Sequence, residues 1–296
     1  MKKIFGINIG SKDFGESFLK TAIDSGVGAQ KIRAKHSCMV LRDGEVAWYE
    51  KGARISLADV SYSFFRVRGK YPLMTSLIAN LIEKSGIPSN DSYNKDHTDA
   101  NHKITQMLLL TLAKLPIPNT ILCTFDGFAS NKDVILAEIS FPCVLKVNGS
   151  QGRSVWKVED REDLERYVRD INSANEVFLL QEYIENSFDI RALYFDGDFL
   201  GAIARASADG GFLNNVSQGG TVRVIDVTDE EKEIVKKAAE VLKFDFVGAD
   251  IVRTPRGPML FELNVGPQVY GFESATGHDV AALLVSRILA KHVKGD

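Results

Sequence analysis

The stretch Gly248-Ala-Asp-Ile-Val-Arg-Thr-Pro-Arg-Gly-Pro-Met-Leu-Phe-Glu-Leu-Asn264 decides which fold the sequence predicts. Two short apolar runs flank a turn sequence, Thr254-Pro-Arg-Gly257, and this pattern is typical of a β-hairpin. We expect a three-residue loop, Pro255 to Gly257, with the glycine in the left-handed conformation. That loop pairs the two strands so that Asp250 faces Glu262.

Asn264 is expected on the same face as Glu262, because strand side chains alternate with a period of two. Opposed strand residues have β-carbons about 4.5 to 5.5 Å apart, so Asp250 and Glu262 repel each other unless a cation lies between them. Three oxygen ligands on rigid strands suit Mg²⁺, which completes its shell with water and phosphate oxygens. A surface hairpin that sets Ile251 against Phe261 is the alternative, and a two-residue loop would turn Asp250 to the other face.

The composition is that of a globular chain long enough for two domains, or for one domain and a lid, with 296 residues, 45% hydrophobic and 25% charged. A net charge of -3 gives no electrostatic reason to expect nucleic acid or an anionic membrane as a partner. The apolar runs are too short to span a bilayer, and the N-terminus lacks the pattern of a signal peptide. Three widely spaced cysteines without a CxxC motif predict reduced thiols in a cytoplasmic protein.

The first 90 residues predict a small α/β domain. A buried strand over residues 4 to 9 is followed by an amphipathic helix that stops at Gly26. Asp43-Gly44, between two apolar runs, indicates a hairpin. The polar stretch from residue 90 to 102 has no apolar periodicity, so we expect a linker or loop there.

Two lysines and a glycine loop point to a phosphate ligand. Lys103 lies in the first turn of a predicted helix, where a cation opposes the helix dipole and gains from a nearby anion. A solvated lysine is the alternative there. Lys146 interrupts the apolar strand 141–147, and a charge so placed usually has a partner. The loop Gly149-Ser-Gln-Gly-Arg-Ser154 either surrounds phosphate oxygens with backbone N–H groups or is an ordinary hairpin turn.

Two arginines are expected to be neighbours. A hairpin around Asp196-Gly197 brings Arg191 and Arg205 together, because both lie at strand ends remote from that turn. Adjacent guanidiniums are costly without an anion between them, unless each finds a carboxylate, and Asp189 is the nearest candidate for Arg191. The glycine-rich stretch 209–220 that follows has a length typical of functional or disordered loops.

Taken in chain order, these features resemble those of the ATP-grasp superfamily, most closely the RimK-like amino acid ligases. The likeness covers roughly residues 90 to 292, and its densest motifs are GADIVR, RGPMLFELNVGP and TGHDVA. It implies a mixed α+β and α/β architecture in which two α+β subdomains grip ATP, preceded by a small α/β domain. The implied division is 1–90 for the N-terminal domain, 91–180 for a central subdomain with the glycine loop, and 181–296 for a C-terminal subdomain with the metal site.

The resemblance also implies which residues contact the nucleotide. They are Lys103, Lys146, Gly149, Ser150, Gln151, Gly152, Ser154, Gln181, Glu182, Ile184 and Asp189. The lysines would hold phosphates and the glycine loop would cover them. Glu182 and Ile184 would meet adenine through backbone groups, and Asp189 would lie near the ribose.

The family pattern further implies a metal site and a reaction centre. The implied ligands of magnesium are Asp250, Glu262 and Asn264. Two ions are expected, with manganese as an alternative metal. Arg205 and Asn215 would lie by the reacting phosphoryl group, and Arg191 is the third catalytic candidate.

The reaction that the resemblance implies joins a carboxylate to an amine. The substrate carboxylate attacks the γ-phosphate of ATP to give an acylphosphate, which the amine then attacks to form an amide or peptide bond. An ATP-dependent ligase acting on an amino acid or peptide is the leading hypothesis. A phosphotransferase and a non-catalytic nucleotide-binding protein are the alternatives. The expected partners are ATP, the acid and the amine, and a homo-oligomer stays open.

The substrate-facing segments depart from the family pattern. Basic residues usually precede the Gly-Gly pair, whereas this chain has Leu213 and Ser217-Gln218. The metal-binding glutamate is usually followed by Asn-Ala-Ser-Pro-Gly, whereas this chain has Asn264-Val-Gly-Pro-Gln268. We therefore predict the class of reaction without naming the acid or the amine.

Overall fold

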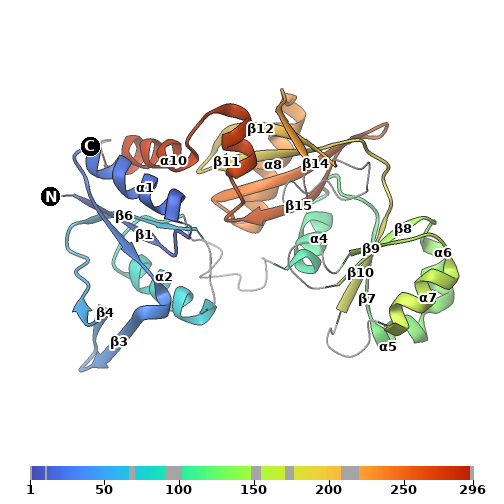
Figure 1. Cartoon of the computed structure of the whole chain (residues 1–296). Helices are drawn as coiled ribbons and strands as arrows, with labels where there is room; N and C mark the ends of the chain where they lie inside the picture. Colours follow the sequence, from blue (N-terminus) through green and yellow to red (C-terminus); the bar gives the residue numbers. More distant parts are fainter. Residues whose placement is uncertain are drawn as a thin grey trace.

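Four β-sheets and the helices around them make up the described part of the chain in this computed structural model (Figure 1). The structure describes residues 2–10, 12–66, 71–90, 102–147, 155–170, 177–207 and 220–293. The N-terminal sheet lies at one end and the four-stranded central sheet at the other, with the five-stranded C-terminal sheet between them (Figure 1). Within these ranges, none of the helices has the length and apolar content that a bilayer crossing needs.

A parallel three-stranded sheet in the order β2-β1-β6 forms the N-terminal unit, as the strand and helix pattern at the start of the chain predicts. Strands β1 and β6 are almost wholly buried, which fits a parallel sheet covered by helices. The elements are β1 (Lys3–Ile7), α1 (Lys12–Asp24), β2 (Gly28–Ile32), β6 (Val60–Phe65) and α2 (Pro72–Lys84).

A short antiparallel sheet in the order β3-β4-β5 lies between β2 and β6 along the chain. Asp43 and Gly44 connect β3 to β4, and both have a positive φ, 53° and 78°. Positive φ at both central residues is the requirement of a two-residue type I′ turn, so the expected hairpin is confirmed. The elements are a 3-10 helix (Ala34–His36), β3 (Ser37–Arg42), β4 (Glu45–Glu50) and β5 (Ala53–Arg54).

The central sheet consists of four antiparallel strands in the order β7-β10-β8-β9. Its hydrophobic core lies between these strands and the helices α5, α6 and α7. Lys146 alternates with the core residues Leu145 and Val147, so its side chain leaves the sheet on the face opposite to this core. The elements are β7 (Thr120–Thr124), α5 (Phe125–Ser130), α6 (Lys132–Glu138), β8 (Cys143–Val147), β9 (Val155–Val158), α7 (Arg161–Asp170) and β10 (Val177–Glu182).

The C-terminal sheet has five antiparallel strands in the order β13-β12-β11-β14-β15. Its two faces belong to different cores: Ala192 packs with α8 and α4, whereas Leu193 packs with α9 and α10. Thr228 and Glu231 form a capping box at the start of α8. The elements are α4 (Lys103–Leu112), β11 (Asp189–Phe195), β12 (Asp198–Ala206), β13 (Thr221–Val224), α8 (Asp229–Leu242), β14 (Phe246–Thr254), β15 (Gly257–Val265), α9 (Tyr270–Thr276), α10 (Val280–Ile288) and a π-helical segment (Leu289–Val293).

The turn of the β14–β15 hairpin differs from the expected one. Thr254 pairs directly with Gly257, so the turn has two residues and the three-residue loop was wrong. Gly257 does have a positive φ, 103°, as expected. With a regular ladder from this turn, Phe261 would stand opposite Asp250.

A register shift further along the hairpin corrects this offset. Ile251 pairs with Leu260, whereas the preceding residue, Asp250, pairs with Glu262. The residue left over is Phe261, which makes this a β-bulge in β15. The bulge restores the predicted facing of Asp250 and Glu262, although the loop length that led to the prediction was wrong.

The N-terminal unit shares a hydrophobic core with the C-terminal sheet. Phe18 and Phe64 stack with their ring centroids 5.1 Å apart. Phe64 also contacts Phe195 and Phe246 of the C-terminal sheet, at 6.0 and 5.9 Å. Helix α1 lies beside α10 (Figure 1), so the two ends of the chain are held together by apolar packing.

Substitution of Phe64 tests this shared core. Phe64 is fully buried, so Phe64→Ala is expected to lower the free energy of unfolding by about 3 to 5 kcal/mol in urea denaturation. Leu41→Ala is the control, because Leu41 is 74% exposed, and it should change stability by less than about 0.5 kcal/mol. Equal effects of the two substitutions would contradict the packing described here.

Candidate functional site

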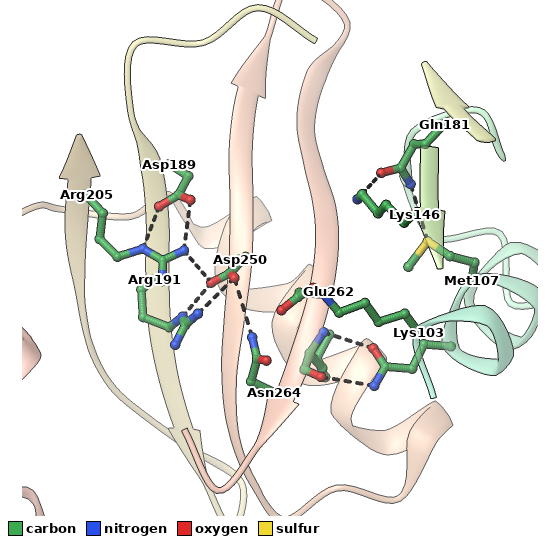
Figure 2. Close-up of polar contacts among 12 residues, drawn as sticks. Lys103, Met107, Lys146, Gln181, Asp189, Arg191, Arg205, Asp250, Glu262 and Asn264 are labelled. Carbon is green, nitrogen blue, oxygen red and sulfur yellow. Dashed lines mark hydrogen bonds and ion pairs between the residues drawn. The ribbon is translucent and has the colours of Figure 1, made fainter. Parts of the chain in front are cut away.

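Four charged side chains alternate across three neighbouring strands of the C-terminal sheet (Figure 2). Arg205 on β12 donates to both carboxylate oxygens of Asp189 on β11, at 2.7 and 2.8 Å. Arg191 on β11 donates to both oxygens of Asp250 on β14, at 2.5 and 2.9 Å. Nη2 of Arg205 also lies 3.0 Å from Oδ1 of Asp250. The two arginines are therefore neighbours, as expected, and the anion between them is Asp250.

Strand order explains why Arg191 binds Asp250 rather than Asp189, the carboxylate that the sequence suggested for it. Strand β11 lies between β12 and β14, with Arg191 directly opposite Asp250 and Asp189 directly opposite Arg205. Directly opposed residues on antiparallel strands point to the same face and have neighbouring β-carbons. The suggestion of Asp189 as the partner of Arg191 was therefore wrong.

The two guanidiniums keep Asp250 ionised. Burial alone would raise the pKa of Asp250, but the positive charges of Arg191 and Arg205 outweigh it and lower this pKa to about 2. Burial likewise acts to lower the pKa of Arg205, and the charges of Asp250 and Asp189 raise it above its ordinary value. Asp250 and Arg205 therefore keep their charges in the neutral pH range, whereas burial raises the pKa of Asp189 to about 6.

Helix α4 brings a lysine to the other acidic residue of the hairpin. Lys103, the first residue of α4, places Nζ 2.5 Å from Oε2 of Glu262. One helical turn further, the buried Gln106 donates to the carbonyl of Leu263 at 3.0 Å and accepts the N–H of Leu263 at 3.1 Å. These bonds fix α4 against β15 at the residue between Glu262 and Asn264. In this structure Glu262 is the anion that Lys103 was expected to reach.

Lys146 on β8 extends from the central sheet toward the side of the site that carries Glu262 (Figure 2). Its Nζ donates to Oε1 of Gln181 at 2.6 Å and lies 5.7 Å from the centre of the Phe261 ring. Burial lowers the pKa of Lys146 to about 8, the charge of Glu262 opposes this shift, and the charge of Lys103 adds to it. The expected partner of this lysine is present, although it is a neutral amide.

The last two residues of β10 have different roles in the structure. Gln181 is buried and donates Nε2 to the hydroxyl of Thr120 at 3.0 Å, which directs its Oε1 to Lys146. Glu182 donates its N–H to the carbonyl of Asn119 at 3.0 Å and accepts the N–H of Asn119 with Oε1 at 2.9 Å. The end of β10 is thereby fixed to the segment that enters β7.

The three expected metal ligands come together on the β14–β15 hairpin. Asp250 stands opposite Glu262, and Nδ2 of Asn264 lies 3.4 Å from Oδ2 of Asp250. Among the described residues, no group of three or more His, Cys, Asp and Glu is arranged to hold a metal. Two carboxylates and an amide oxygen are nevertheless hard donors of the kind that Mg²⁺ accepts, so these residue types fit the ion. In the structure Arg191 and Lys103 neutralise the same carboxylates.

Other expected site residues fall near or beyond the edge of what the structure describes. Ile184 follows β10 in a segment without regular structure and is partly buried. Six of the expected site residues lie outside the described ranges: Gly149, Ser150, Gln151, Gly152, Ser154 and Asn215.

Two residues that sequence reasoning did not single out support the site. Gln106 hydrogen-bonds to β15. The sequence could have indicated it by its position three residues after Lys103, on the same face of an amphipathic helix. Arg256, at the hairpin turn, donates to Oε1 of Glu182 at 2.6 Å. Nothing in the local sequence of a turn indicates a partner 74 residues away.

Two antiparallel sheets face each other across the site: the central sheet brings Lys146, and the C-terminal sheet brings the hairpin with Asp250 and Glu262. PsnB, an ATP-grasp ligase solved in complex with a minimal precursor, matches this structure with a TM-score of 0.75. The match covers 98% of each chain at 18% identity, so it shows a shared ATP-grasp fold. The chain belongs to the RimK-like ATP-grasp family, whose model matches residues 100–288. The family and the fold predicted from the sequence are thereby confirmed.

Relatives in this family are similar over part of their length. A probable alpha-L-glutamate ligase of Enterobacter sp. (strain 638) is 36% identical over 194 residues, which is 64% of this chain and 64% of that protein. A probable alpha-L-glutamate ligase of Shewanella halifaxensis (strain HAW-EB4) is 32% identical over 267 residues, 88% of this chain and 57% of that protein. The chain thus spans less than two thirds of the length of these relatives.

The lowered pKa of Lys146 predicts a pH-dependent contribution to stability. With a pKa of about 8 in the folded chain and roughly 10.4 unfolded, the unfolded chain binds more protons between these values. The free-energy cost of burying the ammonium therefore applies in full below pH 8. It disappears as the pH rises to about 10.5. Relative to Lys146→Met, the wild type should gain about 1 to 3 kcal/mol over this range in denaturant titrations. A pH-independent difference would contradict the assignment.

Substitution of Gln106 tests the clamp between α4 and β15. Gln106→Met keeps the side-chain volume but leaves both peptide groups of Leu263 without these partners, so we expect a loss of about 2 to 4 kcal/mol in urea denaturation. Leu108→Met, on the exposed side of the same helix, is the control and should cost less than about 0.5 kcal/mol. A loss no larger than that of the control would mean that the two hydrogen bonds do not stabilise the site.

Proposed function

We propose that this chain is an ATP-dependent carboxylate–amine ligase that forms an amide or peptide bond and releases ADP and phosphate. The observation that carries the proposal is the convergence of Lys103, Lys146, Asp250 and Glu262 from α4, β8 and the β14–β15 hairpin. Phosphoryl transfer from ATP is catalysed mainly by positioning and by neutralisation of phosphate charge, and these groups supply both. Membership of the RimK-like ATP-grasp family supports the same reaction class.

The phosphates of ATP are assigned to the two lysines. The ammonium of Lys146 donates to a neutral amide, that of Gln181, and burial lowers its pKa, so a phosphate beside it would stabilise its charged form. Lys103 is bound to Glu262 but is 38% exposed, so its ammonium is accessible to a ligand. We assign the loop from Gly149 to Ser154 to cover the phosphates through its backbone N–H groups.

The adenosine part is assigned to the end of β10. Backbone groups of Glu182 and Ile184 would meet adenine, and Asp189 would lie near the ribose. Both oxygens of Asp189 also accept hydrogen bonds from Arg205, so we give Asp189 the further role of holding that arginine. Gln181 is assigned to orient Lys146, because its amide oxygen accepts the bond from that ammonium.

Magnesium is assigned to Asp250, Glu262 and Asn264, with two ions proposed and manganese as an alternative. The ions would neutralise negative charge on the phosphates and on the phosphoryl group in transfer. Arg191 and Arg205 hold the Asp250 carboxylate ionised and oriented for this role. Such outer partners of a metal ligand fix its geometry.

The proposed chemistry has two steps. The substrate carboxylate attacks the γ-phosphorus of ATP, so that a new oxygen–phosphorus bond forms while the bond to the β-phosphate oxygen breaks and ADP leaves. The amine then attacks the acyl carbon of the acylphosphate, phosphate leaves, and the amine nitrogen loses a proton. We assign Arg205, Arg191 and Asn215 to stabilise negative charge that develops during these steps.

The substrates proposed are an amino acid or a peptide. PsnB was solved with a precursor, and the two relatives bear the name of alpha-L-glutamate ligases. Neither fact names the acid or the amine of this chain, whose substrate-facing segments differ from the family pattern.

We also propose three domains, 1–90, 91–180 and 181–296, in a cytoplasmic protein. The separate core of the central sheet supports the middle unit, whereas the first and last units are joined by a common core. Free thiols at Cys38, Cys123 and Cys143 support a reducing compartment.

An assay of ADP release tests the proposed function. The enzyme with Mg²⁺ and ATP is screened against amino acids and peptides in pairs, and products are identified by mass spectrometry. A ligase gives ADP in step with an amide product that contains both partners. Release of ADP with a phosphorylated product and no dependence on the amine would instead indicate a phosphotransferase.

Asp250→Asn is expected to reduce substrate-stimulated ADP release at least about 100-fold, because it removes a charged metal ligand and the partner of two arginines. Asp198→Asn is the matched control: Asp198 also binds an arginine, Arg287 of α10 at 2.7 Å, but it lies beside the turn of the β11–β12 hairpin, at the end remote from Asp189 and Arg205. The control should retain activity within about twofold. Unchanged turnover in Asp250→Asn would refute the catalytic role of this site.

A further inference from the structure

Arg256 connects the β14–β15 hairpin to the central sheet. It lies in the two-residue turn of the β14–β15 hairpin, six residues along the chain from Asp250. Its Nη2 donates to Oε1 of Glu182 at 2.6 Å, and its backbone N–H donates to the hydroxyl of Thr254 at 3.0 Å. The guanidinium of this turn residue thus contacts Glu182, the last residue of β10.

The carboxylate of Glu182 is shared between this arginine and the start of β7. Oε1 accepts the N–H of Asn119 at 2.9 Å, and Oε2 accepts its side-chain amide at 3.3 Å. A backbone hydrogen bond makes a second connection: the N–H of Leu260 on β15 donates to the carbonyl of Pro116 at 2.8 Å. The hairpin is therefore attached to the central sheet where β10 ends and β7 begins.

We infer that Arg256 is a positioning residue for the nucleotide: through Glu182 it fixes the end of β10 relative to the hairpin that carries Asp250, Glu262 and Asn264. The inference rests on the proposed function, in which β10 receives adenine and the hairpin receives the metal and phosphates. In that assignment the central sheet holds adenine, and the phosphates lie between Lys146 of the central sheet and the hairpin of the C-terminal sheet. A ligand that bridges two elements binds more tightly when their separation is preorganised.

The exposure of this ion pair argues against a mainly structural role. The side chains of Arg256 and Glu182 are 53% and 20% exposed, and ion pairs at the surface contribute little to folding stability. A second arginine of the same hairpin, Arg253, binds Glu231, which is only 1% exposed, at 2.7 Å. Arg253 therefore has the stronger structural contact, but it faces α8 and not the end of β10.

These two arginines provide a matched experiment. Binding of a non-hydrolysable ATP analogue with Mg²⁺ is measured by titration calorimetry for the full chain and for Arg256→Ala, Arg256→Lys and Arg253→Ala. The analogue should bind about three- to tenfold more weakly to Arg256→Ala, with partial recovery in Arg256→Lys and a change below about twofold in Arg253→Ala. Magnesium tripolyphosphate, which has no adenosine, should lose less affinity in Arg256→Ala than the ATP analogue does.

A double substitution tests whether Arg256 acts through Glu182. The variant Glu182→Ala/Arg256→Ala should bind the analogue no more weakly than Glu182→Ala alone, because the second substitution removes a contact that is already lost. Additive losses, equal effects of Arg256→Ala and Arg253→Ala, or a parallel loss of tripolyphosphate binding would each overturn the inference. Absence of analogue binding to the wild type would instead refute the proposed function on which the inference rests.

Discussion

Two carboxylates on facing strand positions impose the constraint on which the rest of the site depends. Asp250 and Glu262 are directly opposed, so their negative charges destabilise the hairpin unless cations neutralise them. The structure does this with cations from three places: Arg191 on the neighbouring strand, Arg205 one strand further away, and Lys103 on α4. Strand order, register and the docking of α4 all serve to bring these charges together.

The same arrangement explains how a site can be built between two sheets. The central sheet contributes Lys146, held by Gln181, and the C-terminal sheet contributes the acidic hairpin. The central sheet has its own core, whereas the C-terminal sheet shares a core with the N-terminal unit through Phe64. Polar contacts such as the one between Arg256 and Glu182 therefore connect the two sides of the site.

Local patterns were sufficient to predict most of the elements and many of the residues, but not every partner. The facing of Asp250 and Glu262 was predicted from a three-residue loop, but the turn has two residues and a bulge at Phe261 restores the predicted pairing. The pairing of Arg191 was missed because it depends on β14 lying beside β11, and strand order between distant segments is set by the packing of the whole sheet. Gly149 to Ser154 and Asn215 remain predictions.

A crystal structure with Mg²⁺ and an ATP analogue tests the central claim most directly. The account predicts ions within about 2.0 to 2.1 Å of oxygens from Asp250, Glu262 and Asn264, bridged to the phosphates that Lys103 and Lys146 contact. Phosphates and ions bound elsewhere, with the carboxylates still paired only to Arg191 and Lys103, would contradict it.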